Sequence, residues 1–233
     1  MKHSYNSIKN SFHSEEPWIN IFLLKYITIP LVYLMVNYTK ITPNIISILS
    51  MSFGLYSAYC YFTGDLTLGA LMYFVSYIFD ATDGKVARIT KTCMPYGAWL
   101  DICIDRLNLL LISTAIAYNN YNYTNNVTLV FLNCLFLGLA FIGWESRYNI
   151  DFFKLKNNIP SKIAKKSYSK YEKWCKKKGV IKSPVSLPEI FLFYLIIAPL
   201  FSIEFQSLII IIFFLLLRII FQQNFWLSGI KNK

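Results

Sequence analysis

Ionisable side chains are scarce in this 233-residue sequence, in which Asp, Glu, Lys and Arg together make up 15% of the residues. Soluble domains contain about 25% of such residues, whereas 55% of this chain is hydrophobic. Histidine occurs only as His3 and His13, and no two of the five cysteines have CxxC spacing. A zinc site or a disulfide framework is therefore not expected. The composition favours a protein whose solvent is largely lipid.

The apolar residues gather in long stretches separated by short polar turns. Crossing the hydrocarbon core of a bilayer takes roughly 20 mostly apolar residues. Six stretches reach or approach this length, with few charges or prolines inside them: 45–62, 66–79, 96–118, 127–144, 185–203 and 207–226. We therefore expect an all-α, polytopic membrane protein. Residues 1–233 form one domain, in which residues 45–226 make a bundle of six transmembrane helices.

One further apolar stretch, residues 18–38, is ambiguous. It is long enough to cross a bilayer, but Lys25 and Pro30 interrupt it. We expect an N-terminal interfacial amphipathic helix that lies in the headgroup region, with a seventh crossing as the alternative.

The basic residues are concentrated on one side of this arrangement. Residues 149–184 contain eleven lysines, and the turn after residue 79 adds Lys85, Arg88 and Lys91. The turns expected on the opposite side, 63–65, 119–126 and 204–206, contain neither Lys nor Arg. Basic loops face the cytoplasm in membrane proteins, so both termini are expected there. The net charge of +11 is then explained without a nucleic-acid partner. Residues 149–184 are expected to be a solvated, partly disordered cytoplasmic loop that attracts acidic lipid.

Four carboxylates stand in two closely spaced pairs between residues 79 and 106. Asp80 and Asp83 are three residues apart, and Asp101 and Asp105 are four apart. Either spacing places both members of a pair on one face of a helix. Pro95 separates the pairs, so one pair ends a helix and the other begins the next, antiparallel one. The four acids are expected to converge at the cytoplasmic end of the bundle.

Such a group of like charges near lipid requires a counter-charge. All-oxygen ligands favour Mg²⁺, Mn²⁺ or Ca²⁺ over zinc, and magnesium in proteins often binds carboxylates together with substrate phosphates. Two ions sharing bridging carboxylates are plausible for this set. Two alternatives are a structural cluster of ion pairs with neighbouring Lys and Arg side chains, and a transporter that binds a cation in transit. Transporters place their ion sites near the bilayer midplane, which disfavours the second alternative.

Small residues and one arginine complete a longer pattern, D-x2-D-G-x2-A-R-x8-G-x3-D-x3-D. The chain matches it at every fixed position: Asp80, Asp83, Gly84, Ala87, Arg88, Gly97, Asp101 and Asp105. This pattern resembles the signature of the CDP-alcohol phosphotransferases of class I, and the six-helix layout extends the resemblance loosely over most of the chain. Thr42, Pro43 and Asn44 form a second match to that family. Independently of the family, these three residues also have the pattern of a helix start, in which Thr42 is the N-cap.

The resemblance implies an enzyme in which an alcohol attacks a metal-bound CDP-linked donor and CMP leaves. Asp80, Asp83 and Asp101 would ligate metal, while Asp105 would help to bind a second ion and act as the catalytic base. The CDP-binding residues would be Pro43, Asn44, Gly84, Ala87 and Arg88. The cofactor would be Mg²⁺ or Mn²⁺, in two ions, and a homodimer is expected because family members often form one.

The favoured function is transfer of a phosphatidyl group from CDP-diacylglycerol to a small polar alcohol, a step of phospholipid biosynthesis. The alternative is transfer of a phospho-alcohol from a soluble CDP-alcohol to a lipid such as diacylglycerol. A phosphorylated acceptor would require nearby cations, for which Arg106, Arg147 and Arg218 are candidates. We expect an integral protein of the cell inner membrane whose active site faces the cytoplasm.

Overall fold

The described part of the chain consists mainly of helices joined by short turns. The computed structural model describes residues 3–10, 16–156, 170–180 and 186–231. The helices are α1 (Tyr5–Asn10), η1 (Asn20–Leu24, a π-helix), α2 (Lys25–Tyr38), α3 (Pro43–Thr63), α4 (Leu66–Thr90), α5 (Pro95–Thr124), α6 (Val127–Lys156), α7 (Lys170–Lys178), α8 (Leu187–Leu192), η2 (Phe193–Ile197, π), α9 (Ala198–Leu200) and α10 (Glu204–Lys231). These residues contain no strand, only an isolated parallel bridge between Glu16 and Val180.

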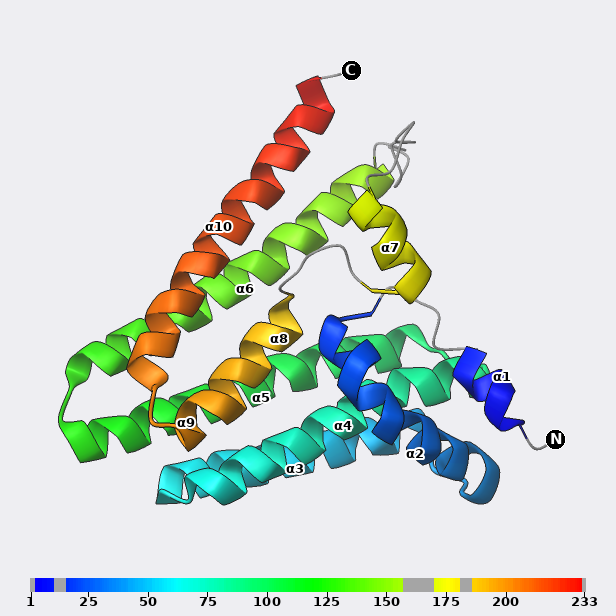
Figure 1. Ribbon diagram of the computed structural model, residues 1–233, viewed down its shortest axis with the longest axis horizontal. Helices are drawn as coiled ribbons and strands as arrows, with labels where there is room; N and C mark the ends of the chain where they lie inside the picture. Colours follow the sequence, from blue (N-terminus) through cyan, green and yellow to red (C-terminus); the bar gives the residue numbers. More distant parts are fainter. Residues whose placement is uncertain (1–2, 11–15, 157–169, 181–185, 232–233) are drawn as a thin grey trace.

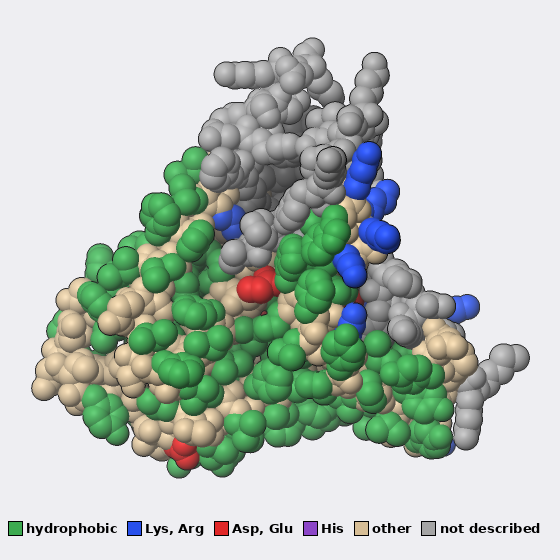
Figure 2. Space-filling model, viewed as in Figure 1, with side chains coloured by type: hydrophobic (Ala, Val, Ile, Leu, Met, Phe, Trp, Pro, Cys, Tyr) green, Lys and Arg blue, Asp and Glu red, His purple; other side chains and the backbone are tan. Residues whose placement is uncertain are grey.

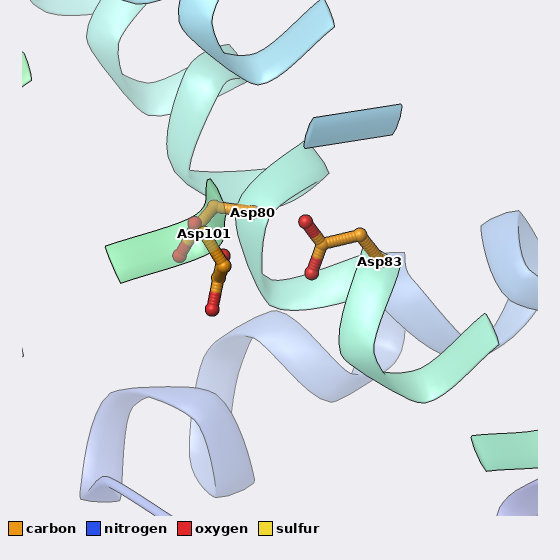
Figure 3. A group of neighbouring side chains, drawn as sticks. All are labelled: Asp80, Asp83 and Asp101. Carbon is orange, nitrogen blue, oxygen red and sulfur yellow. The ribbon is translucent and has the colours of Figure 1, made fainter. Parts of the chain in front are cut away.

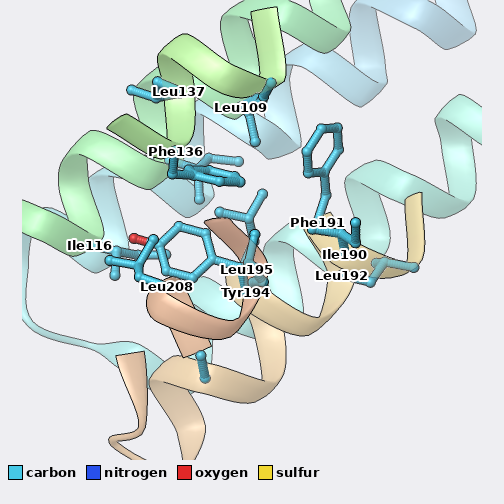
Figure 4. Packing of buried hydrophobic residues seen from close by; sticks show 14 of the residues in the cluster. Leu109, Ile116, Phe136, Leu137, Ile190, Phe191, Leu192, Tyr194, Leu195 and Leu208 are labelled. Atoms are coloured by element: carbon cyan, nitrogen blue, oxygen red, sulfur yellow. The ribbon is translucent and has the colours of Figure 1, made fainter. Parts of the chain in front are cut away.

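The long helices form two groups that are joined by the fifth apolar stretch. Helices α4 and α5 both pack against α3, and α6 packs against α10. Between the groups runs the continuous segment α8–η2–α9, which contacts α4, α5 and α10 (Figure 1). Its side chains fill the main hydrophobic core, where Tyr194 and Leu195 pack with Phe136 of α6 and Leu208 of α10 (Figure 4).

The turns between these helices have simple local causes. Helices α3 and α5 each begin with a proline, at Pro43 and Pro95, where the missing N–H group is not needed. Thr42 stands at the N-cap of α3 as expected, but its side chain makes no capping hydrogen bond. Helix α3 ends at Gly64, whose φ of 93° suits only a residue without a side chain. The adjacent Asp65 then caps α4 by accepting a hydrogen bond from the N–H of Leu68 at 3.0 Å.

The expected helices are present, but several run further than the apolar stretches that predicted them. Helix α4 continues past residue 79 to Thr90, and therefore carries the whole Asp80–Arg88 segment on one rigid element. Three described stretches are long and apolar enough to cross a membrane: 20–38, 43–63 and 127–146. The count of six crossings stays a prediction. Residues 20–38, which the sequence predicts to lie flat in the headgroup region, are among these three stretches.

The basic segment 149–184 differs from the expected disordered loop wherever the structure describes it. Residues 149–156 continue α6, because they include no Gly or Pro that would end it. Residues 170–178 form α7, and residues 157–169 and 181–185 lie outside the described part of the chain. Lys and Arg side chains gather beside α7 on the face shown in Figure 2, whereas most of the rest of this face is hydrophobic.

Close packing of α4 on α3 depends on Gly69. A Cβ atom at this position would lie 2.9 Å from the ring of Tyr61, which is fully buried and donates a hydrogen bond to the carbonyl of Leu195. We expect Gly69→Ala to destabilise the protein by about 1–3 kcal/mol, because the ring has no free space into which to move. Thermal unfolding in detergent measures the change. Gly138→Ala is the matched control, since no atom of the residues that the structure describes lies within 4 Å of its added Cβ. An equal loss of stability in both variants would contradict the packing argument.

Candidate active site

Three of the four predicted carboxylates meet where α4 faces α5. Asp80, Asp83 and Asp101 each offer one oxygen atom, and these atoms all lie within 4.8 Å of one another (Figure 3). Helices α4 and α5 run in opposite directions, as the sequence predicted (Figure 1), but each packs mainly on α3 and not on the other. Helix α3 therefore fixes the spacing between the two carboxylate pairs.

Asp83 is the most enclosed member of this trio, with 5% of its surface exposed. Its carboxylate accepts hydrogen bonds from the hydroxyl of Ser47 and from the backbone N–H of Gly84. Asp80 and Asp101 are half-buried. Ser47 was not predicted as a site residue. It lies three residues after Asn44 on α3, so helical spacing from the Thr42–Asn44 segment was a usable signal.

Asp105 lies one turn after Asp101 on α5 and is not a member of the close trio. It is exposed, and together with Asp80 it lines a cavity of about 190 Å³ between α4, α5 and α8. It also lines a smaller recess with Ile102, Arg106 and Trp144. A carboxylate in this position can contact a molecule that enters the cavity beside the trio.

The predicted nucleotide-binding residues gather at the same end of the helices. Among the described residues, a Cβ atom at Gly84 would have only the Nη1 atom of Arg88 within 4 Å, at 3.5 Å. Arg88 is exposed, one turn further along α4. The first turns of α3 and α5 also meet here, because a Cβ atom at Gly97 would lie 3.2 Å from Oδ1 of Asn44. Ala87 of α4 and Pro43 of α3 are half-buried. In the sequence, Ala87 is next to Arg88 and Pro43 is next to Asn44.

Lys85, one of the cations of the ion-pair alternative, forms an ion pair with a residue outside the quartet. Its Nζ atom lies 3.4 Å from a carboxylate oxygen of Glu16, and only 4% of the Lys85 side chain is exposed. The lysine is therefore turned toward the N-terminal segment. The sequence offered no signal for this pair, because 68 intervening residues separate its members.

The three arginines proposed to bind the phosphate of an acceptor have different surroundings. Arg106 lines the recess beside Asp105, with its guanidinium carbon 5.8 Å from the centre of the Trp144 ring. Arg218 is half-buried on α10. The side chain of Arg147 lies outside the part of the molecule that the structure describes. Arg106 is therefore the cation whose position beside the carboxylates is established.

The donor set fits a divalent metal ion. All three groups of the trio are carboxylates, which are the hard oxygen ligands that Mg²⁺ and Mn²⁺ prefer. Their mutual repulsion at this distance, within a partly buried site, is relieved by a bound cation. The open Gly84 surface leaves space beside the trio for a phosphate group to approach. The arrangement therefore suits a metal bound jointly by protein carboxylates and a phosphorylated substrate.

Residues 40–227 match the family model described as CDP-alcohol phosphatidyltransferase. The chain is 37% identical over 68 residues to the bifunctional IPC transferase and DIPP synthase of Aquifex aeolicus, a match covering 29% of this chain and 15% of that protein. It is 34% identical over 68 residues to the archaetidylinositol phosphate synthase of Pyrococcus horikoshii, covering 29% of this chain and 36% of that protein.

One solved structure is similar over nearly the whole fold. It is the phosphatidylinositol phosphate synthase of Mycobacterium tuberculosis with CDP-DAG bound, with a TM-score of 0.53 and 18% sequence identity. The alignment covers 88% of this chain and 92% of that one. At this identity the likeness establishes the fold alone.

Proposed function

Because the chain belongs to the CDP-alcohol phosphatidyltransferase family, and so is a membrane enzyme that transfers a phosphate-containing group, we propose that it moves the phosphatidyl group of CDP-diacylglycerol onto a small polar alcohol. CMP is the second product, and the reaction is a step of phospholipid biosynthesis. The observation that carries the proposal is the convergence of Asp80, Asp83 and Asp101 beside a cavity that Asp105 also lines.

Asp80, Asp83 and Asp101 hold Mg²⁺ or Mn²⁺ in this proposal, and Asp105 helps to hold a second ion. When bound, the ions neutralise charge on the diphosphate of the donor and on the departing CMP. Ser47 supports the site by fixing the orientation of the Asp83 carboxylate.

Asp105 acts as the base that takes the proton from the acceptor hydroxyl. The alcohol oxygen then forms a bond to the phosphorus atom that bears the diacylglycerol. The bond between this phosphorus and the bridging oxygen breaks, and CMP leaves with the electron pair. Exposure of Asp105 to the cavity supports the assignment, because a base must reach the hydroxyl that it deprotonates.

Pro43, Asn44, Gly84, Ala87 and Arg88 bind the CDP part of the donor in this scheme. The open surface at Gly84 admits a diphosphate close to the α4 backbone. Arg88 extends from the next turn, where its guanidinium can contact phosphate oxygens. Asn44 lies in the first turn of α3, which meets the first turn of α5 at Gly97.

The acceptor to test first is a phosphorylated inositol. Two of the similar proteins have inositol phosphate synthase in their names, and Arg106 lies beside Asp105, where a cation can bind the phosphate of an acceptor. The second candidate function is transfer from a soluble CDP-alcohol to a lipid acceptor, which the same carboxylates can support. We further propose that the site faces the cytoplasm, as the Lys-rich side of the molecule indicates, and that the chain forms a homodimer.

In the decisive experiment, the purified enzyme is incubated with labelled CDP-diacylglycerol and with Mg²⁺ or Mn²⁺. The acceptors are serine, glycerol 3-phosphate, inositol and inositol phosphate, and products are identified by mass. The expected result is CMP release together with one new phospholipid. Turnover with a soluble CDP-alcohol and diacylglycerol, but not with CDP-diacylglycerol, would instead establish the second candidate. Activity that persists in excess chelator would contradict the metal-dependent mechanism.

Removal of the Ser47 hydroxyl tests the support of the metal site. We expect Ser47→Ala to raise the Mg²⁺ concentration needed for half-maximal activity by about 10- to 100-fold, because Asp83 loses one of the two donors that orient its carboxylate. Metal titrations at saturating CDP-diacylglycerol measure the shift. Ser52→Ala is the matched control, since Ser52 is exposed on the same helix and donates to the carbonyl of Ile48 within that helix. A Ser47→Ala titration that overlays the wild-type curve would remove Ser47 from the site.

A further inference from the structure

We propose that the segment Glu16–Asn20 forms a wall of the acceptor cavity, in which Asn20 and Tyr77 are specificity-determining residues that bind hydroxyl groups of a polyol. This inference rests on the proposed function and assigns its acceptor contacts. Glu16 and Lys85 are the positioning pair that holds the wall in place. None of these four residues belongs to the pattern of carboxylates and small residues described above.

The N-terminal segment reaches the cavity directly. Pro17 and Asn20 line it, together with Asp80 and Asp105. The hydroxyl of Tyr77, three residues before Asp80 on α4, donates a hydrogen bond of 2.8 Å to Oδ1 of Asn20. Asn20 also begins the π-helix η1, a form of helix that is often found at functional sites.

Three separate attachments hold this segment against the rest of the molecule. The Glu16 carboxylate pairs with the Lys85 ammonium at 3.4 Å, with both side chains largely buried. The backbone N–H of Glu16 donates to the carbonyl of Gly179 at 2.9 Å, just beyond α7. The N–H of Ile19 donates to Glu189 at 3.4 Å, and Glu189 in turn caps α8 with Ser186. Anchors to α4, α8 and the end of α7 make this a fixed wall.

The Asn20–Tyr77 pair offers both hydrogen-bonding roles to a ligand. Oδ1 of Asn20 accepts the hydrogen bond from the Tyr77 hydroxyl. The side-chain NH₂ group of Asn20 can therefore donate to a ligand, and the Tyr77 oxygen can accept from one. A hydroxyl group both donates and accepts, so it satisfies such a pair fully. A charged ammonium or phosphate matches only one half of the pair.

The remaining polar lining of the cavity is also neutral, apart from the two carboxylates. Ser50, Ser76 and Asn108 also line it, each with at most 6% of its surface exposed. Oδ1 of Asn108 is buried and accepts no hydrogen bond from the described residues. No Lys or Arg is found among the described residues that line this cavity. The chemistry therefore suits a polyhydroxylated face of the acceptor, while any phosphate on the acceptor lies toward Arg106 in the adjoining recess.

Kinetics with Asn20→Ala and Tyr77→Phe test the assignment. We expect each variant to raise KM for a polyol acceptor by about 5- to 30-fold, because a hydroxyl in the cavity loses its partner. The KM for CDP-diacylglycerol should stay within about twofold of the wild-type value, since the donor-binding residues are elsewhere. Asn37→Ala and Tyr59→Phe serve as controls. Asn37 bonds His3, outside the cavity, and Tyr59 is 61% exposed.

Acceptor analogues sharpen the test. Inositol analogues that lack one hydroxyl should lose affinity for the wild-type enzyme at one ring position, and the same deletion should cost nothing further in Tyr77→Phe. If removal of a hydroxyl costs the same affinity in Tyr77→Phe as in the wild-type enzyme at every ring position, the assignment is wrong. A fall in kcat that is equal for all acceptors, an increase in donor KM alone, or a wild-type preference for serine would also overturn it. Should Asn20→Ala not fold, Asn20→Ser in the same assay decides. Failure of the wild-type enzyme with every donor and acceptor would overturn the proposed function itself.

The positioning pair has its own measurement. Glu16→Gln should raise the acceptor KM without changing the Mg²⁺ dependence, because it loosens the wall but leaves the carboxylate trio intact. The exchanged double variant Glu16→Lys/Lys85→Glu should recover most of the lost acceptor affinity. A purely structural role would instead lower the yield of folded protein and kcat together, with no separation of KM from kcat.

Discussion

Asp101→Asn is expected to reduce CMP release by about a thousandfold or more, because it removes one of three carboxylates that hold the metal ion. Asp101 is the only member of the trio supplied by α5, while Asp80 and Asp83 come from α4. Its loss therefore leaves the metal attached to one helix only. The measurement is the release of labelled CMP from CDP-diacylglycerol at saturating Mg²⁺.

The same substitution should not destabilise the fold. Without metal, three carboxylates within 4.8 Å repel one another, and neutralising one of them lowers that repulsion. The Tm of Asp101→Asn in a metal-free buffer is expected to equal or exceed that of the wild type. Asp65→Asn is the matched control, since Asp65 is exposed at the opposite end of α4 and asparagine also caps helices. Undiminished CMP release by Asp101→Asn would end the metal assignment.

Asp105→Asn is expected to lower the rate of the chemical step by about 100- to 10,000-fold, the range typical for loss of a general base. Donor binding should change much less, because Asp105 lines the cavity and is not part of the close trio. Single-turnover experiments with prebound CDP-diacylglycerol separate the two effects. If donor affinity collapses while the single-turnover rate is preserved, Asp105 binds the donor complex and another group accepts the proton.

The two single variants and their combination distinguish the roles further. If Asp101 holds metal and Asp105 acts chiefly as the base, high Mn²⁺ should restore the activity of Asp101→Asn much more than that of Asp105→Asn. Equal restoration of both by metal would show that Asp105 contributes chiefly as a ligand. The double variant should be no worse than the poorer single variant, because residues that act as one unit are not additive.

The sequence determined the helices and the carboxylate set by local rules. Pro43, Pro95 and Gly64 fix helix ends wherever they occur, and the spacings of Asp80 to Asp83 and Asp101 to Asp105 fix which residues share a helical face. The family assignment followed from the same spacing and was confirmed by the match over residues 40–227. These features depend on residues within about 26 positions of one another, so the order of the chain is enough to specify them.

The residues that join that set from distant parts of the chain are known from the packing of the helices. Ser47 reaches Asp83 because α3 packs against α4, and Glu16 reaches Lys85 because the N-terminal segment folds back over the end of α4. The Asn20–Tyr77 pair arises in the same way. Such contacts depend on how whole helices dock, which is set by the summed packing of many side chains and leaves no periodic signal at the residues that touch. The extent of α6 and the helix α7 were missed for a related reason, since a charged segment is able to continue or form a helix wherever no Gly or Pro ends it.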